Sequence, residues 1–180
     1  MAVTGLYGGA FDPPHVGHVA LGLAAKQHFG LPRLLVLVSA QPAHKGTHLD
    51  AETRLELARA AFPDDEVRLD PYPRTIELLR GERFEEPLFV VGADEFCDFL
   101  AWSEPDAVLE LAELGVGTRP GFPRERLDAV LDRLRQPDRV HFFDLVPNAA
   151  ASTAIRASGD LELVPAPVAE IIRERGLYRP

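Results

Sequence analysis

The sequence predicts an α/β protein whose strands form a parallel, doubly wound β-sheet. Short, continuous apolar runs such as Leu34 to Val38 and Leu88 to Val91 are typical of strands that are buried on both faces of a parallel sheet. Segments with apolar residues at helical spacing separate these runs, the first of them from Val16 to Phe29. Strands and helices that alternate in this way form parallel sheets with right-handed crossovers.

The expected elements follow one another along the whole chain. The apolar runs that we interpret as strands lie at residues 2–7, 34–38, 67–69, 88–91, 115–118 and 140–143. The segments that we interpret as helices lie at residues 16–29, 51–62 and 75–79, in a stretch that follows Gly92-Ala93-Asp94 and runs to residue 100, and at 104–113, 124–135, from 152 onward, and 167–175. Local signals support the second helix, because Asp50 is suited to cap its N-terminus and Pro63 follows its end.

Length and composition fit one compact domain over residues 1–180. Of the 180 residues, 46% are hydrophobic, which is enough for one full-sized core. The single cysteine, Cys97, rules out an internal disulfide framework, fits a reducing compartment, and is expected to be a partly buried core residue. No apolar stretch reaches the length of a membrane span, and no basic segment precedes the first strand. We therefore expect a soluble, cytoplasmic protein.

The charge of the chain limits its partners. A formal net charge of −9 at pH 7 argues against binding to nucleic acid or to an anionic membrane, because both require a basic surface. A small anionic substrate remains compatible with this charge if helix N-termini and a few basic side chains supply local donors. The sequence leaves the oligomeric state open, a homo-oligomer included.

The stretch from Tyr7 to His18 joins the first expected strand to the first expected helix. We expect Gly8 and Gly9 to let the backbone turn sharply and approach a ligand closely. The start of the helix is expected to offer unpaired N–H groups and the positive end of its dipole to an anion. His15 lies three residues before His18, so both rings are expected on one face, within reach of one phosphate group. The alternative, an ordinary turn with two histidines, does not explain this spacing.

In a doubly wound sheet the ligand lies at the carboxyl ends of the strands. The loops that begin at residues 8, 39, 92, 118 and 144 are therefore the expected site. His44 and Lys45 follow the second strand, and Lys45 is a candidate point charge for phosphate. In isolation this pair would be interpreted as a solvated surface loop, and His48 is expected to be simply exposed.

A second candidate anion site begins at Ser152. An ordinary capped helix would need only Ser152 or Thr153, which leaves Arg156 without a role. At four-residue spacing, Arg156 shares a helix face with Ser152 and would present a forked donor to an anion at the helix N-terminus.

Two further features belong to the same expected crevice. Gly92 and Asp94 follow a strand and suit a ribose, because glycine allows close approach and a carboxylate accepts from hydroxyls. A helix N-cap role for Asp94 is an equal alternative. Trp102, the only tryptophan, is expected to pack in the core or at its rim, or to stack on an aromatic heterocycle.

These residues resemble the signatures of the nucleotidylyltransferase superfamily. Its first signature, Gly-x-Phe-Asp-Pro-x-His-x-Gly-His, is matched at every fixed position from Gly9 to His18. Its second signature, Ile-Ser-Ser-Thr-x-Ile-Arg, is matched from Ser152 to Arg156, with Ala150 and Ala151 at the first two positions.

Over nearly all of the chain, the pattern is most similar to the bacterial nicotinate mononucleotide adenylyltransferases. Further matches are His44-Lys45, Gly92-x-Asp94, Trp102, Arg119-Pro120-Gly121 and the tail Gly176-Leu177-Tyr178. The resemblance implies a Rossmann-like fold that transfers the adenylyl group of ATP to nicotinate mononucleotide. The products would be nicotinate adenine dinucleotide and pyrophosphate, as in NAD biosynthesis.

The resemblance also assigns roles to individual residues. It implies catalytic roles for His15, His18, Lys45 and Arg156. The residues that it places against the nucleotide are Gly8, Gly9, Ala10, Phe11, Gly17, Gly92, Asp94, Arg119, Ser152 and Thr153. It implies no metal site on the protein itself, because Mg²⁺ would be held mainly by the substrate phosphates and water.

The acceptor half of the expected site departs from the family pattern. The family commonly has Ser-Tyr-Thr-x-Asp-Thr-Leu where residues 73–79 read Pro-Arg-Thr-Ile-Glu-Leu-Leu, so Thr75 is kept and Arg74 replaces the tyrosine. We expect Arg74, Thr75, Trp102 and His44 at the acceptor. Arg74 would either recognise a carboxylate, which favours nicotinate over nicotinamide, or point into solvent. The departures leave open another acceptor, such as phosphopantetheine, or a cytidylyltransferase acting on a phosphorylated alcohol.

Two alternatives from other functional classes fit the sequence less well. A metal hydrolase would use His15, His18 and His44, but no acidic residue is placed as in His-Glu-x-x-His, and the glycines would have no role. A non-catalytic nucleotide sensor would not need the charged residues that both phosphate-binding signatures retain.

Overall fold

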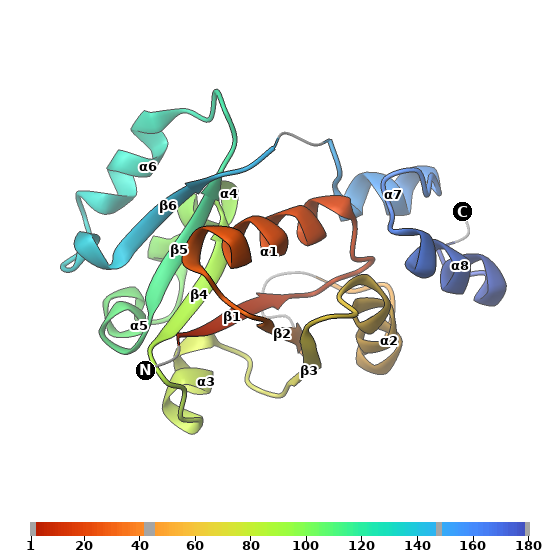
Figure 1. Ribbon diagram of the computed structural model, residues 1–180, viewed down its shortest axis with the longest axis horizontal. Helices are drawn as coiled ribbons and strands as arrows, with labels where there is room; N and C mark the ends of the chain where they lie inside the picture. The colour runs from red at the N-terminus through yellow and green to blue at the C-terminus, as the bar shows by residue number, and fades with distance from the viewer. Residues whose placement is uncertain (1–2, 42–45, 147–148, 179–180) are drawn as a thin grey trace.

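The computed structural model describes residues 3–41, 46–146 and 149–178. Within these residues, six strands form one sheet: β1 (Thr4–Gly9), β2 (Leu34–Ser39), β3 (Glu66–Asp70), β4 (Pro87–Gly92), β5 (Glu113–Thr118) and β6 (Val140–Asp144). Their spatial order is β3-β2-β1-β4-β5-β6, and every neighbouring pair is parallel (Figure 1). This is the strand order of a doubly wound α/β fold, so the predicted fold class is confirmed.

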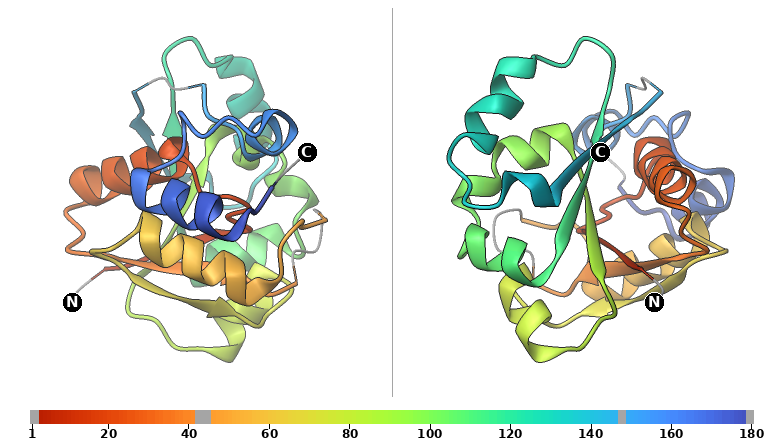
Figure 2. Two further views of the ribbon diagram at one scale, coloured as in Figure 1. Left: turned by 90° about the vertical axis from the view of Figure 1, so that its right-hand side faces the viewer. Right: turned by 60° about the vertical axis from the view of Figure 1, so that its left-hand side comes forward.

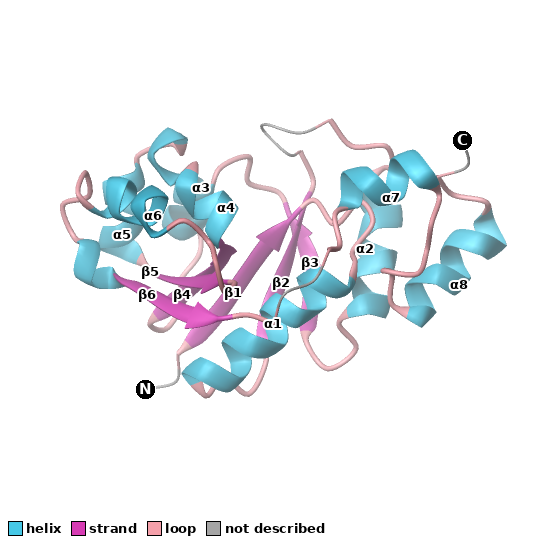
Figure 3. Ribbon diagram, turned by 90° about the horizontal axis from the view of Figure 1, so that it is seen from above, coloured by secondary structure: helices cyan, strands magenta, loops and turns pink. Residues whose placement is uncertain are grey.

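Helices cover both faces of this sheet (Figure 3). The α-helices of the described residues are α1 (Val16–Phe29), α2 (Ala51–Ala61), α3 (Thr75–Gly81), α4 (Ala93–Cys97), α5 (Pro105–Leu111), α6 (Arg124–Leu131), α7 (Ser152–Ser158) and α8 (Ala166–Arg175). Residues of α1, α2, α7 and α8 belong to one hydrophobic core, and residues of α3 to α6 belong to a second core.

Each central strand contributes to both cores, because successive side chains of a strand point to opposite faces of the sheet. In β1, Leu6 packs in the core with α3 to α6, whereas Tyr7 packs in the core with α1 and α2. In β2, Leu37 likewise packs in the core with α3 to α6, whereas Val36 packs in the core with α1 and α2. This arrangement explains why these strands read as continuous apolar runs.

Two helices end earlier than expected, one by two residues and the other by four. The helix expected at 104–113 ends at Leu111, and β5 already begins at Glu113, because Ala112 is extended and Glu113 pairs with Leu88 of β4. The helix expected to reach Arg135 ends at Leu131. The residues after it make short turn bonds, among them Leu134 N–H to the Leu131 carbonyl at 3.1 Å.

The C-terminal helices return to the start of the chain. Figure 2 shows α8 beside α2, where Arg175 pairs with Glu56 at 2.7 Å between N and O. The amide of Val16, at the start of α1, donates to the carbonyl of Leu163 at 2.9 Å. The C-terminal segment therefore lies against the loop that leads into α1. Among the described residues, no helix combines the length and apolar character that a membrane crossing requires.

Candidate active site

A cavity of about 1140 Å³ opens at the carboxyl end of the sheet, around the ends of β1 and β4. The strand order reverses between these two strands, and ligands of doubly wound folds bind at this point. Every predicted site residue in the described part of the chain lines this cavity: Gly8, Gly9, Ala10, Phe11, His15, Gly17, His18, Arg74, Thr75, Gly92, Asp94, Trp102, Arg119, Ser152, Thr153 and Arg156. His44 and Lys45, the remaining two predicted residues, lie outside the described residues.

The expected glycine turn is wrong in its detail. Gly8 and Gly9 belong to β1 and pair with Leu37 and Val38, and the sharp change of direction is made by Phe11, at φ 50°. A Cβ on Gly9 would lie 2.9 Å from the Phe11 ring. The glycines are therefore needed where an aromatic side chain packs over the strand, while the left-handed conformation falls on Phe11, which is 1% exposed.

His15 and His18 form a reciprocal capping arrangement at the start of α1. His15 is the N-cap rather than a residue of the first turn: its Nδ1 accepts from the amide of His18 at 3.3 Å, and Nδ1 of His18 accepts from the amide of His15 at 3.2 Å. The rings stack with centroids 3.7 Å apart, so they lie on one face, as the three-residue spacing indicated. Since each Nδ1 is an acceptor, each neutral imidazole carries its proton on Nε2 and can donate it to a phosphate.

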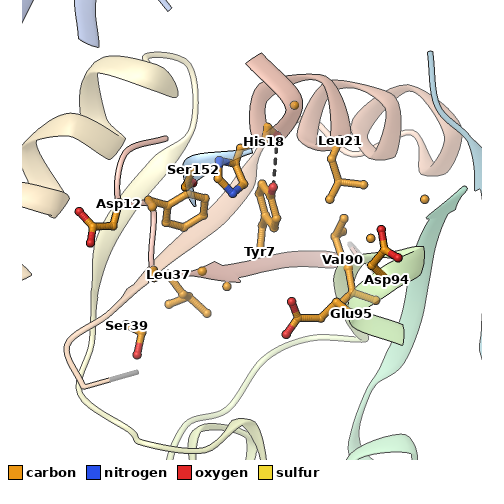
Figure 4. A pocket seen from close by; sticks show the side chains of 18 of the residues that line it. Tyr7, Asp12, His18, Leu21, Leu37, Ser39, Val90, Asp94, Glu95 and Ser152 are labelled. Carbon is orange, nitrogen blue, oxygen red and sulfur yellow. Dashed lines mark hydrogen bonds between the residues drawn. The ribbon is translucent and has the colours of Figure 1, made fainter. Parts of the chain in front are cut away.

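The same arrangement corrects the expectation of unpaired amides at this helix start. The amides of Val16 and His18 already donate to Leu163 and to the His15 ring. Tyr7 supports the helix from the cavity floor, because its hydroxyl donates to the carbonyl of His18 at 3.3 Å (Figure 4). Burial, and then the charge of Glu95, raise the pKa of this hydroxyl, so Tyr7 remains a neutral donor.

Burial lowers the pKa of His15 to about 4, and this leads to a prediction about stability. Above pH 6.5 the ring is neutral in both folded and unfolded protein. As the pH falls from 6.5 towards 4, the unfolded chain takes up the proton more readily, so the free energy of unfolding falls, by about 3 kcal/mol at most. Urea midpoints at pH 7 and pH 4.5 should differ more in the wild-type protein than in His15→Asn, which keeps a capping acceptor and cannot titrate. Equal pH dependence in both proteins would contradict a buried neutral His15.

The two predicted anion-binding segments meet in space. Ser152 Oγ donates to the carbonyl of Pro13 at 2.9 Å, and a guanidinium nitrogen of Arg156 donates to the carbonyl of Asp12 at 2.5 Å. A second nitrogen of Arg156 contacts Thr153 Oγ1 at 3.3 Å. Ser152 therefore does not cap α7, and the face that it shares with Arg156 fixes α7 to the loop between β1 and α1. The whole cluster lines the cavity.

Gly92 and Asp94 occupy the opposite wall of the cavity. Gly92 is the N-cap of α4, so the N-cap role considered for Asp94 is wrong. The carboxylate of Asp94 lies 3.3 Å from Arg119 and 3.6 Å from Arg126, measured between O and N. Its side chain is 66% exposed, so its oxygens remain accessible to a hydroxyl ligand.

Three of the four residues expected at the acceptor, Arg74, Thr75 and Trp102, line the same cavity, whereas His44 lies outside the described residues. Trp102 packs edge to face on Phe99 and Phe89, with centroids 5.2 and 6.0 Å apart, and still lines the cavity. Trp102 therefore packs against the core and is also accessible to a ligand in the cavity. Arg74 is exposed at the start of α3 and pairs with Glu77 at 2.9 Å, and the half-buried Thr75 follows it.

Sequence reasoning missed buried residues whose hydrogen bonds fix the loop between β1 and α1. Arg54 is 1% exposed and donates to the carbonyls of Ala10 and Leu49, at 2.8 and 3.1 Å. Asp12 is 3% exposed, and its carboxylate accepts from the Tyr178 hydroxyl and from the amide of His48. His48 is exposed, as expected. Asp12 is a fixed position of the first signature and could have been singled out, whereas nothing local distinguishes Arg54 from the other charged residues of its helix.

The metal-hydrolase alternative gains no support from the described residues. Among them, which exclude His44, no group of three or more His, Cys, Asp or Glu side chains could hold a metal ion. The Nδ1 atoms of His15 and His18 are occupied by amide donors, and the rings lie parallel instead of converging on one point.

The sequence matches a known family and a set of curated proteins. The family model described as cytidylyltransferase-like matches residues 6–158. A probable nicotinate-nucleotide adenylyltransferase of Rubrobacter xylanophilus is 35% identical, over 98% of this chain and 92% of that protein. Another of the same name, from Thermus thermophilus, is 32% identical, over 97% of this chain and 98% of that protein.

Solved structures share the fold over almost the whole chain. The nicotinic acid mononucleotide adenylyltransferase of Plasmodium falciparum, complexed with NaAD, matches with a TM-score of 0.76 at 14% identity, over 99% of this chain and 98% of that one. A putative nicotinate-nucleotide adenylyltransferase of Vibrio parahaemolyticus matches with a TM-score of 0.64 at 20% identity, over 99% of this chain and 96% of that one. From the sequence matches, together with the two signatures that meet in one cavity, we conclude that the chain belongs to the cytidylyltransferase-like family of nucleotidyltransferases.

Proposed function

We propose that this protein transfers the adenylyl group of ATP to nicotinate mononucleotide, giving nicotinate adenine dinucleotide and pyrophosphate. The observation that carries the proposal is the joining of α7 to the loop before α1, which brings Arg156 and Ser152 beside His15 and His18 in one cavity. The curated relatives named nicotinate-nucleotide adenylyltransferase support this choice of reaction. We further propose that residues 1–180 act as one domain, in the cytoplasm.

The reaction needs positioning and charge stabilisation more than acid–base chemistry. A 5′-phosphate oxygen of the acceptor attacks the α-phosphorus of ATP, and the bond to the β-phosphate oxygen breaks. The second pKa of a phosphate is about 6, so at pH 7 the nucleophile is largely ionised and needs no general base. Donors that are already in place then stabilise the charge that develops on the phosphate oxygens.

The described residues supply such donors. In this proposal, Nε2–H of His18 lies nearest the α-phosphate and Nε2–H of His15 lies beside it. Arg156 and the hydroxyl of Thr153 hold the remaining phosphates, and we propose the same role for Lys45, which lies outside the described residues. Asp94 accepts from the ribose, at the wall opposite α7.

Mg²⁺ would accompany the ATP. This ion takes oxygen ligands and keeps several waters, so substrate phosphates and a few carboxylates suffice for it. Among the described residues, the carboxylates that line the cavity are those of Asp12, Asp70, Asp94 and Glu95, and no three metal-ligating side chains are grouped together. When bound, Mg²⁺ would neutralise charge on the pyrophosphate that leaves.

Product analysis tests the reaction itself. Purified protein with ATP, Mg²⁺ and nicotinate mononucleotide should form nicotinate adenine dinucleotide and pyrophosphate in equal amounts, and replacing ATP by CTP should yield little of either. A product that forms from CTP and not from ATP would favour the cytidylyltransferase alternative. ATP binding without pyrophosphate release, with any acceptor, would favour the sensor.

Arg74 offers a prediction about the choice of acceptor. We propose that its guanidinium leaves Glu77 to pair with the carboxylate of the nicotinate ring. Arg74→Ala should then lower kcat/KM for nicotinate mononucleotide about tenfold, the equivalent of about 1.4 kcal/mol, and leave the value for nicotinamide mononucleotide nearly unchanged. Arg80→Ala is the matched control, since Arg80 lies on the same helix and pairs with Glu104 away from the cavity. Equal losses for both acceptors would show that Arg74 does not read the carboxylate.

A further inference from the structure

Asp12 is the residue where four separate segments of the chain meet, three of them at its carboxylate and the fourth at its main-chain carbonyl. Asp12 itself lies in the loop between β1 and α1 and is 3% exposed. One carboxylate oxygen accepts from the Tyr178 hydroxyl at 2.5 Å, and the other accepts from the amide of His48 at 2.6 Å. The main-chain carbonyl of Asp12 accepts from Arg156 at 2.5 Å. Asp12 thus links the phosphate-binding loop, the segment after residue 46, α7 and the C-terminal tail.

Tyr178 reaches Asp12 from a tail that other contacts hold in place. The tail leaves α8 at Gly176, and the amide of Leu177 donates to the carbonyl of Ile172 at 3.0 Å. Leu177 and Tyr178 pack against the core that contains α1 and α2. Tyr178 adopts φ 54°, a left-handed conformation that is unfavourable for a bulky residue and directs its ring back towards the loop.

The hydrogen bond between Tyr178 and Asp12 belongs to a strong class of hydrogen bonds. An O–H donor to an ionised carboxylate forms a short, charge-assisted hydrogen bond, and low exposure strengthens it further. Tyr178 does not itself line the cavity, whereas Asp12 and Arg156 do. The hydrogen bond to Asp12 therefore connects Tyr178 directly to a residue that lines the cavity.

We propose that Tyr178 is a positioning residue for the nucleotide: its hydroxyl fixes the Asp12 carboxylate and thereby sets the place of Arg156 and of the loop that carries His15 and His18. This inference rests on the proposed function only in taking ATP as the ligand. A misplacement of about 1 Å in such a frame weakens the contacts that depend on it. The segment at residues 176–178 would then be part of the active-site frame, although Tyr178 does not line the cavity.

Direct titration of ATP with Mg²⁺, without any acceptor, tests the inference. Tyr178→Phe removes one oxygen and should weaken ATP binding about tenfold, whereas Arg175→Ala, which removes the exposed pair of the same tail with Glu56, should leave ATP binding within twofold. Urea midpoints of all variants report whether each one is folded. Wild-type affinity for ATP in Tyr178→Phe, or an equal loss in Arg175→Ala, would overturn the inference.

A double-mutant cycle separates positioning from a general structural role. In the Asp12→Ala background, adding Tyr178→Phe should change ATP affinity by less than twofold, because the hydroxyl has lost its acceptor. Additive losses would mean that Tyr178 acts by another route, which overturns the inference. If wild-type protein binds ATP but does not use nicotinate mononucleotide, the proposed function fails while this test still reports on Tyr178. If wild-type protein does not bind ATP, both fail.

Discussion

Replacing His18 by alanine should lower the turnover of adenylyl transfer about a hundredfold, with a small effect on folding. Contacts with other described residues help to hold the His18 ring. Its Nδ1 accepts from the amide of His15, it stacks on the His15 ring, and it packs edge to face on Phe11 at 5.1 Å between centroids. A donor that is fixed in this way stabilises charge in the transition state without reorganisation. The variant loses both this donor and the bond to the His15 amide.

Two measurements separate these losses. Steady-state kinetics with saturating ATP and acceptor gives the loss of turnover, and a urea midpoint gives the loss of stability, which should be about 1 kcal/mol for the hydrogen bond to His15. His28→Ala is the matched control, because His28 lies on the same helix, stacks on Phe143 at 5.8 Å, and is not part of the large cavity. Near-normal turnover in His18→Ala would show that the assignment of this histidine is wrong.

Arg156 should have the second large effect, on kcat/KM for ATP. Arg156→Ala removes a forked cation whose orientation is set by Asp12 and Thr153, and we expect a loss of about 100- to 1000-fold. Arg156→Lys keeps the charge and loses the fork, so it should recover only part of the activity.

The control for Arg156 is an arginine of the described residues that lies outside the cavity. Arg133 is exposed in the turn after α6, and Arg133→Ala should leave kcat/KM for ATP unchanged. Full activity in Arg156→Lys would mean that a point charge suffices and that the forked geometry has no role. Full activity in Arg156→Ala would remove Arg156 from the site.

The sheet and most helices were predictable because their signals are local. The runs Leu34 to Val38 and Leu88 to Val91 are apolar throughout because both of their faces are covered. Asp50 caps α2, as its position before the apolar pattern indicated, and its carboxylate accepts from the Thr53 amide at 2.9 Å. The ends of α5 and α6 were missed because strand pairing and short turn bonds, rather than propensity, decide them.

The cavity was predictable to the extent that its residues fall at the carboxyl ends of strands. The geometry within it was not. The expected turn at Gly8 and Gly9 lies at Phe11 instead, because packing of aromatic rings over β1 outweighs the conformational freedom of glycine. The roles of Arg54 and Tyr178 depend on contacts with partners 44 and 166 positions away in the sequence. The pattern of residues along the chain does not show which residues so far apart in the sequence come into contact.

The choice of acceptor is the central claim, and one measurement tests it most directly. Pyrophosphate release from ATP and Mg²⁺ should be followed side by side with nicotinate mononucleotide, nicotinamide mononucleotide and phosphopantetheine at equal concentrations. We predict that nicotinate mononucleotide gives the dominant response, with nicotinamide mononucleotide well below it. A dominant response to phosphopantetheine would contradict the proposed function and leave only the fold and the nucleotide half of the site in place.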